Sequence, residues 1–151
     1  DEKVIELLIN NADIMACPEA RIEGQWESQF GVNHLGHFLF TTQLLPALLA
    51  AQTSRVVCLS SSGHKLSGMR WDDINFEHSP YEKWPAYGQA KTANALFALR
   101  LDMKYAEQGL SAFSVHPGGI MTPLQRHLET EEMIALGWLG EDGELSELAA
   151  P

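Results

Sequence analysis

The sequence is poor in cysteine, and its two cysteines form no recognisable pair. Cys17 and Cys58 stand outside any Cys-x-x-Cys motif and outside any cluster with zinc-ligand spacing. We therefore expect two free thiols that pack as small buried hydrophobes, and no metal site. Free cysteines are typical of a reducing compartment, so we expect a cytoplasmic protein.

Basic residues are also scarce, because 10 Lys and Arg stand against 20 Asp and Glu, for a net charge of −10. Nucleic acids and anionic membranes attract basic surfaces, so neither is expected as a partner. No apolar run is long enough to span a bilayer, and no signal peptide is evident, so we expect no transmembrane segment in this chain. With 151 residues, of which 45% are hydrophobic, the chain can form one domain with a sizeable core.

Three short apolar runs, each bounded by polar or turn residues, predict buried strands. They lie at Val4–Ile9, Arg55–Leu59 and Ala112–Val115. Helical patterns separate them, and strands that alternate with helices pair in parallel through right-handed crossovers. The sequence therefore predicts an α/β fold with both crossover helices on the same face of a three-stranded sheet.

The two long helical patterns run from about Trp26 to Ala50 and from about Tyr87 to Glu107. In the second, the apolar residues Leu96, Leu99 and Met103 recur at helical spacing and are expected on the buried side. Gly109 is a plausible stop for this helix.

The remaining segments are connections. The link from Ser60 to Pro85 is long for a strand-to-helix unit, and we expect it to be functional or mobile. A short helix is expected around Thr130–Leu136, and the acidic stretch Gly137–Pro151 is expected to be loosely ordered.

Tyr87 and Lys91 stand four residues apart, so a helix places them on one face. A nearby ammonium favours the phenolate and lowers the pKa of a tyrosine, which makes the pair a usable proton donor and acceptor for a carbonyl or an alcohol. Alone, this spacing is common and also fits an ordinary helix start.

Two other groups follow strands, where ligands of open parallel sheets bind. Ser60, Ser61 and Ser62 could donate to a substrate oxygen or simply cap a turn. Pro117-Gly118-Gly119 lets a ligand approach the backbone, and Thr122 could bind a phosphate or cap the next helix.

Asn33 is a polar residue within the first helical pattern, and Gly36 follows three residues later. The combination suggests close packing or a helix irregularity. His34 and His37 lack a carboxylate partner and are expected to be structural rather than metal ligands.

Taken in order, these motifs resemble the short-chain dehydrogenase/reductase family, in its retinol-dehydrogenase-like and WW-domain-oxidoreductase-like branch. Asn10-Asn11-Ala12-Asp13 resembles the family's Asn-Asn-Ala-Gly motif, and Asn33 resembles its helix asparagine. Ser61 matches its catalytic serine, and Tyr87 and Lys91 match its Tyr-x-x-x-Lys pair. The Pro-Gly-x-x-x-Thr turn of the family corresponds to Pro117, Gly118 and Thr122.

The resemblance implies a partial Rossmann-like, doubly wound parallel sheet made of the family's strands four to six, and an NAD(P)-dependent oxidoreductase. Tyr87 would exchange a proton with the substrate oxygen, which Ser61 would hold. Lys91 would lower the pKa of Tyr87 and bind the nicotinamide ribose, and Asn33 would hold a water. NAD or NADP would also lie against Asn11, Ala12, Pro117, Gly118 and Thr122, and the substrate would be a small alcohol or carbonyl compound.

Two departures from the family pattern stand out. No Gly-x-x-x-Gly-x-Gly stretch occurs, and the resemblance starts just before the family's fourth strand, so we expect one partial domain over residues 1–151 that lacks most of the cofactor site. In addition, Asp13 replaces the motif's glycine, at a position expected to border the adenosine half of the cofactor. The alternative is a non-catalytic remnant that acts through association with other chains, and we expect the isolated chain to self-associate and to be inactive.

Overall fold

A computed structural model describes residues 3–146 and contains one parallel sheet. Its strands, in the spatial order β1-β2-β3, are β1 (Leu7–Asn10), β2 (Ser54–Leu59) and β3 (Leu110–Val115). The predicted strands and their parallel pairing are confirmed. β1 begins three residues later than Val4, because the Ile5 N–H donates to Ala47 O rather than to a neighbouring strand.

The crossover between β1 and β2 is helical over most of its second half. A short η1 (Glu23–Gln25) precedes three consecutive segments, α1 (Ser28–Phe30), the π-helical η2 (Gly31–Leu35) and α2 (Gly36–Leu49). The irregularity expected around Asn33 is therefore a π-helical turn, which is frequent at functional sites.

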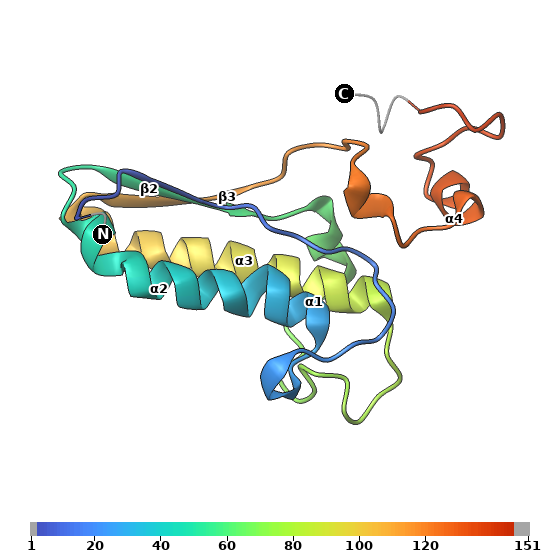
Figure 1. The fold of residues 1–151 in the computed structure, drawn as a ribbon, viewed down its shortest axis with the longest axis horizontal. Coiled ribbons are helices and arrows are strands. Elements are labelled where there is room, and N and C mark those ends of the chain that lie inside the picture. Colours follow the sequence, from blue (N-terminus) through green and yellow to red (C-terminus); the bar gives the residue numbers. More distant parts are fainter. Residues whose placement is uncertain (1–2, 147–151) are drawn as a thin grey trace.

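The crossover between β2 and β3 carries η3 (Ser62–Leu66), α3 (Lys83–Tyr105) and η4 (Ala106–Gln108). Gly109 ends this helix as predicted, with a left-handed φ of 88°. α2 and α3 lie side by side on the same face of the sheet, which confirms the predicted arrangement (Figure 1). The fold is the partial Rossmann-like α/β fold that the sequence predicts.

The core lies between the sheet and the helices α2 and α3, and it does not contain the residues that the apolar stripe of α3 predicts. Leu96, Leu99 and Met103 are 45%, 57% and 69% exposed, so this prediction is wrong. The buried side of α3 instead carries small residues such as Ala90 and Ala98, which let the helix approach its neighbours closely. Phe97 and Leu101 are buried on the same side of α3, whereas Leu96, Leu99 and Met103 point outward.

The opposite face of the sheet is open in the part of the chain that the structure describes. Ile9, Val57 and Phe113 are neighbours across the three strands, and Leu7 and Val115 share the same face. Ile9 and Phe113 are 54% and 46% exposed. Parallel strands are normally buried on both faces, which explains why this face is apolar. It is uncovered because both crossover helices lie on the other face, as the sequence predicts.

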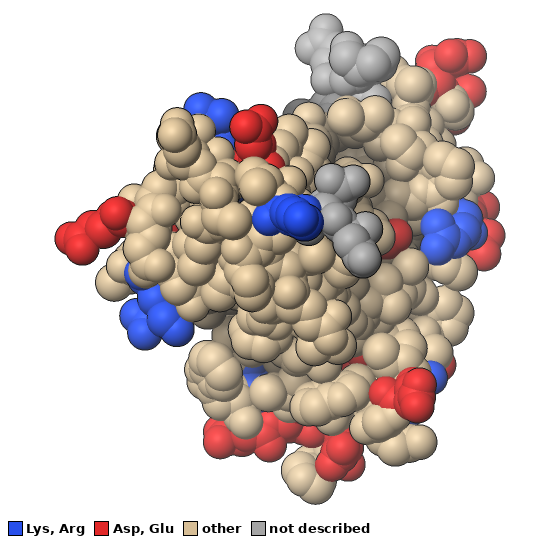
Figure 2. Space-filling model, turned by 60° about the vertical axis from the view of Figure 1, so that its left-hand side comes forward, with Lys and Arg blue, Asp and Glu red and all other residues tan. Residues whose placement is uncertain are grey.

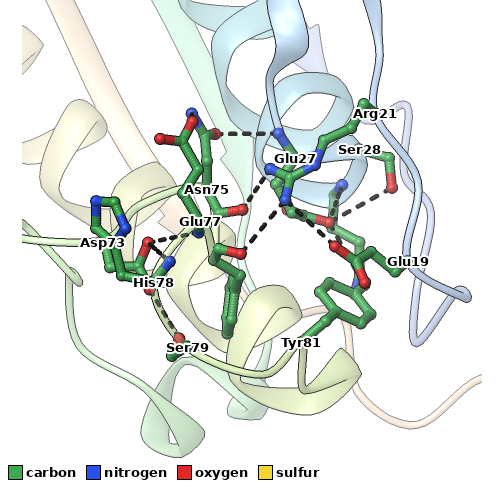
Figure 3. Close-up of polar contacts among 12 residues, drawn as sticks. Glu19, Arg21, Glu27, Ser28, Asp73, Asn75, Glu77, His78, Ser79 and Tyr81 are labelled. Carbon is green, nitrogen blue, oxygen red and sulfur yellow. Dashed lines mark hydrogen bonds and ion pairs between the residues drawn. The ribbon is translucent and has the colours of Figure 1, made fainter.

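A polar network fixes the long connection between β2 and α3 (Figure 3). The fully buried Glu27 carboxylate caps α1, accepting from Gln29 N at 2.8 Å and Phe30 N at 2.7 Å. Glu27 N donates to Asn75 Oδ1 at 3.0 Å, and the Arg21 guanidinium donates to Asn75 O. These bonds join the connection to the segment before α1, and so hold the residues that lead into α3.

The chain after β3 lies beyond the carboxyl ends of the strands and contains η5 (Pro123–Gln125) and α4 (Thr130–Ala135) (Figure 1). The predicted short helix is confirmed. Loose order is wrong for the described part of Gly137–Pro151, because the Trp138 ring meets Trp84 edge to face at 6.3 Å and Ser146 N donates to Trp138 O. Residues 147–151 lie outside the described part.

Charged side chains are scattered over the surface. On the face in Figure 2, Lys and Arg form no large patch, several lie beside an acidic residue, and Asp and Glu lie mainly near the rim. Among residues 3–146, no helix is long and apolar enough to cross a membrane. Cys17 and Cys58 are free and buried, as predicted.

Candidate active site

A cavity of about 930 Å³ opens at the carboxyl ends of the strands. Its walls come from the loops after all three strands, from η3 and α3, and from the segment that ends in Trp138. It brings together every site residue predicted from the sequence except Asn33, namely Asn11, Ala12, Ser61, Tyr87, Lys91, Pro117, Gly118 and Thr122.

Tyr87 and Lys91 enter this cavity from α3. The helix begins at Lys83, four residues before the predicted start, so both residues lie within regular helix and are 4% and 2% exposed. The Lys91 ammonium is 5.3 Å from the centre of the Tyr87 ring. Gly88 allows α3 to pack closely against η3, because a Cβ at this position would lie 2.8 Å from the Gly63 carbonyl oxygen.

Asp13 occupies the space beside this pair. Its Oδ2 atom lies 2.7 Å from Lys91 Nζ and accepts a hydrogen bond from the Tyr87 hydroxyl at 3.4 Å. Lys91 Nζ also donates to Leu59 O at 3.2 Å. The carboxylate therefore lies at the Tyr87–Lys91 pair, a contact that the sequence did not predict, and the expected position of Asp13 beside the adenosine half of a cofactor stays a prediction.

The electrostatics of Tyr87 also differ from the prediction. Burial raises its pKa, the negative charge of Asp13 raises it further, and only a contact with Ser61 opposes the shift. The predicted lowering by Lys91 is wrong, because the ammonium is paired with Asp13. Burial likewise raises the pKa of Asp13 and lowers that of Lys91, and their ion pair opposes both shifts.

The first two serines after β2, Ser60 and Ser61, have different roles. Ser60 is buried and donates to the Lys91 carbonyl oxygen at 3.0 Å, so it holds α3 against the strand end. The Ser61 hydroxyl accepts from Gly63 N at 3.1 Å, lines the cavity and lies close to Tyr87. Of these two, Ser61 is the one whose hydroxyl contacts Tyr87 in the cavity.

Asn33 lies outside the cavity wall but fixes the loop that forms it. It is fully buried in η2, and its side chain bonds the backbone of Ile14, the residue after Asp13. His34 contacts Asn94 through Nδ1 at 3.0 Å, which fits the expected structural role. That Asn33 holds a water stays a prediction.

The residues after β1 and β3 are exposed on the remaining walls. Asn11 and Ala12 directly follow the β1 strand end, and Gly118 adopts a left-handed φ of 93°. Thr122 caps η5, since its hydroxyl accepts from Leu124 N at 3.2 Å. The capping alternative for Thr122 is thus realised in the structure.

Sequence reasoning missed the apolar wall of the cavity. It consists of large side chains from several elements, Leu66, Trp84, Ile120, Leu124, Leu136 and Trp138. Trp84, one turn before Tyr87 on the same helix, was a usable signal. No local pattern pointed to Trp138. It contacts Trp84, but most of α3 and the whole of β3 lie between the two residues in the sequence.

The comparisons with known proteins agree with this geometry, although no family model matches the chain. Short-chain dehydrogenase/reductase prx1 of Penicillium roqueforti is 46% identical over 133 residues, covering 85% of this chain and 39% of that protein. Human retinol dehydrogenase 13 is 42% identical over 127 residues, which cover 84% of this chain and 38% of that protein. A solved structure of an uncharacterized protein from Mycobacterium paratuberculosis matches with a TM-score of 0.69 at 42% identity, covering 77% of this chain and 42% of that one. The chain spans less than half the length of each of these proteins, and it belongs to the short-chain dehydrogenase/reductase family.

Proposed function

We propose that the protein carrying this chain is an NAD(P)-dependent oxidoreductase that interconverts an alcohol and a carbonyl compound. The observation that carries the proposal is the meeting of Ser61, Tyr87 and Lys91 in one cavity at the carboxyl ends of the strands. Ser61 comes from the end of β2, and the other two come from α3.

The residues present fit the nicotinamide half of such a cofactor. Lys91 brings a buried ammonium to the cavity, and an ammonium has three hydrogens to donate, of which Asp13 and Leu59 O engage two. A ligand can approach the backbone at Gly118 closely, because no other atom lies within 4 Å of the position that a Cβ of this residue would take. We propose that Asn11, Ala12, Pro117, Gly118 and Thr122 complete this half of the site. When bound, the nicotinamide supplies or accepts the hydride.

The side chains then divide the acid–base work. Tyr87 donates its hydroxyl proton to a carbonyl oxygen during reduction, and its phenolate takes the proton back from an alcohol during oxidation. Ser61 donates a hydrogen bond to the same oxygen, and Lys91 binds the ribose hydroxyls. Asn33 does not line the cavity, but its side chain bonds Ile14 and so holds the loop that contains Asp13.

The cavity favours an apolar substrate, retinol-like or of another apolar class. Its wall includes Trp84 and Trp138, whose rings meet edge to face, together with Leu124. An apolar substrate gains binding energy from burial against such side chains, while the polar groups at Tyr87 fix the reacting oxygen. The similarity to human retinol dehydrogenase 13 points the same way.

We further propose that residues 1–151 form one partial domain and that the protein works in the cytoplasm, where its buried thiols would stay reduced. The second candidate function is that of a non-catalytic remnant acting through association. The exposed apolar face that contains Ile9 and Phe113 favours it.

Tyr87→Phe tests the catalytic proposal in the full-length protein. The assay follows hydride transfer to or from NAD(H) and NADP(H) with apolar alcohols and carbonyls. Loss of the phenol should lower turnover about 100- to 10,000-fold, the usual value of acid–base catalysis, with the fold intact by circular dichroism. Tyr105→Phe, at the far end of α3, is the matched control and should keep full activity. Near-normal activity of Tyr87→Phe would contradict the mechanism, and an inactive wild-type protein would favour the remnant.

A further inference from the structure

Asp13 is the one acidic side chain that contacts both Tyr87 and Lys91 within residues 3–146. Its side chain is 13% exposed, and its Oδ2 atom meets the Lys91 ammonium at 2.7 Å and the Tyr87 hydroxyl at 3.4 Å. Its other oxygen, Oδ1, is buried without a hydrogen-bond partner in the described part of the chain. A buried carboxylate oxygen without a donor is unfavourable, so the site holds the carboxylate through the contacts of Oδ2.

The position of Asp13 follows from local structure rather than from its own contacts alone. Asn33 Nδ2 donates to Ile14 O at 2.8 Å, and Ile14 N donates to Asn33 Oδ1 at 2.9 Å. Ala16 N donates to the buried Gln29 Oε1 at 2.9 Å. The loop on the carboxyl side of Asp13 is thus clamped to η2 and α1, which directs the carboxylate at α3.

We infer that Asp13 is a positioning residue that ties Lys91 and Tyr87 into a three-residue cluster, competes with the cofactor ribose for the lysine ammonium, and favours the protonated tyrosine. This inference rests on the proposed function, because it concerns how the same site is regulated. At neutral pH, the pair is set to donate a proton to a carbonyl, and alcohol oxidation requires more alkaline solution.

The chemistry behind this bias is like-charge repulsion. Reduction consumes the Tyr87 proton at the carbonyl oxygen while the carbon gains the hydride of the reduced nicotinamide, and solvent then reprotonates the phenolate. Oxidation needs the phenolate first, and a phenolate beside a carboxylate is disfavoured. The Asp13–Lys91 pair also cancels the positive charge that would otherwise stabilise the phenolate.

The other charged or titratable groups around the cluster come from four elements. His37 on α2 lies near Lys91, and Cys17 in the loop after β1 lies near Asp13. His116 after β3 and Arg126 after η5 line the cavity. Burial lowers the pKa of His37 and raises that of Cys17. All four remain in place when Asp13 is changed, so a difference between variants belongs to Asp13.

Two variants of the full-length protein separate charge from bulk. Asp13→Asn keeps the size of the side chain and removes its charge, and Asp13→Gly removes both. Thermal unfolding establishes that each is folded. Ring-labelled tyrosine followed by carbon NMR gives a resonance for each tyrosine of the protein, three of which belong to these 151 residues, and Tyr87→Phe identifies the one of interest.

In a pH titration without cofactor or substrate, both variants should lower the Tyr87 midpoint by about one pH unit or more, with Tyr81 and Tyr105 unchanged. An unmoved or raised Tyr87 midpoint in Asp13→Asn would overturn the inference. This readout does not depend on turnover, so it stands apart from the proposed function, which fails on the activity of Tyr87→Phe.

Cofactor titration by fluorescence provides the second measurement. Both variants should bind NAD(H) or NADP(H) about tenfold more tightly, which corresponds to one charge-assisted hydrogen bond returned to the ribose. Unchanged or weaker binding in both variants would show that Asp13 does not compete for Lys91, and would overturn that part of the inference. In active protein, the alkaline limb of alcohol oxidation should move to lower pH in both variants.

Discussion

Asn33 and the backbone of Ile14 exchange two hydrogen bonds across 19 residues of sequence: Asn33 Nδ2 donates to Ile14 O at 2.8 Å, and Ile14 N donates to Asn33 Oδ1 at 2.9 Å. The asparagine lies in a π-helical turn, which widens the helix and lets its amide face the loop. A side chain outside the cavity wall therefore determines where the loop after β1 lies.

Replacing Asn33 should consequently lower the stability of the protein, because the side chain holds a loop and takes no direct part in the reaction. Asn33→Ala leaves both backbone groups of Ile14 without partners, and we expect a loss of about 2 to 4 kcal/mol in the free energy of unfolding. Chemical denaturation measures this loss. Asn33→Asp keeps the acceptor and loses the donor, so its cost should lie between wild type and Asn33→Ala. Equal stability of all three proteins would contradict the assigned role.

The Lys91–Asp13 ion pair predicts that a second substitution, at Asp13, restores the stability of a Lys91 variant without restoring its cofactor affinity. Lys91→Met leaves a buried carboxylate without its cation and should cost about 3 to 5 kcal/mol of stability, with weaker cofactor binding. Adding Asp13→Asn removes the unpaired charge and should restore most of the stability, while cofactor affinity stays low because the ammonium is still absent. Recovery of affinity in the double variant would show that Lys91 does not bind the cofactor.

Local sequence patterns predicted the architecture well and the electrostatics poorly. Short apolar runs between helical patterns leave few topologies, so the strands, their order and the shared face of the helices followed directly. The stripe of Leu96, Leu99 and Met103 misled, because periodicity reports that a helix has two sides but not which side its neighbours occupy. Small residues such as Ala90 and Ala98 decide that question by allowing close approach.

The site shows the same division between local and distant information. Tyr87 and Lys91 are four residues apart, so a helix alone brings them together. Asp13 is 74 residues from Tyr87, and its contact depends on the Asn33–Ile14 clamp and on the register of β1. No local pattern contains such a contact, which is why the charge beside the tyrosine was missed.

The Lys83–Glu132 contact predicts that acid loosens the wall of the cavity. Glu132 accepts from Lys83 Nζ at 2.6 Å and from Trp84 Nε1 at 2.9 Å, and the bond from Lys83 is the main cause of its lowered pKa. A lowered carboxyl pKa stabilises the fold fully above the ordinary value of 4.5, and this contribution is lost as the pH falls through the folded-state pKa. Both side chains are partly exposed, so the effect on stability is below about 1 kcal/mol.

Glu132→Gln tests this contact. The variant should weaken the contact between α4 and α3 at neutral pH, with a change in tryptophan fluorescence like the one that wild type undergoes below its folded-state pKa. Glu131→Gln, the exposed neighbour on α4, should behave like wild type throughout. A wild-type fluorescence signal that stays constant from neutral pH down to well below 4 would contradict the clamp.

The open face of the sheet predicts that the isolated 151-residue chain associates. Ile9 and Phe113 lie on one row of neighbours across the sheet and are about half exposed, and both outer strands present unpaired backbone groups in the described structure. Exposed apolar surface and open strand edges both drive association. We expect the chain to be aggregated, oligomeric or partly molten by light scattering. Combining Ile9→Thr with Phe113→Ser should reduce the scattering, whereas Leu39→Ser on the outer side of α2 should reduce it less. A cooperatively melting monomer would contradict this prediction, and a stronger effect of Leu39→Ser would place the association on the helices instead.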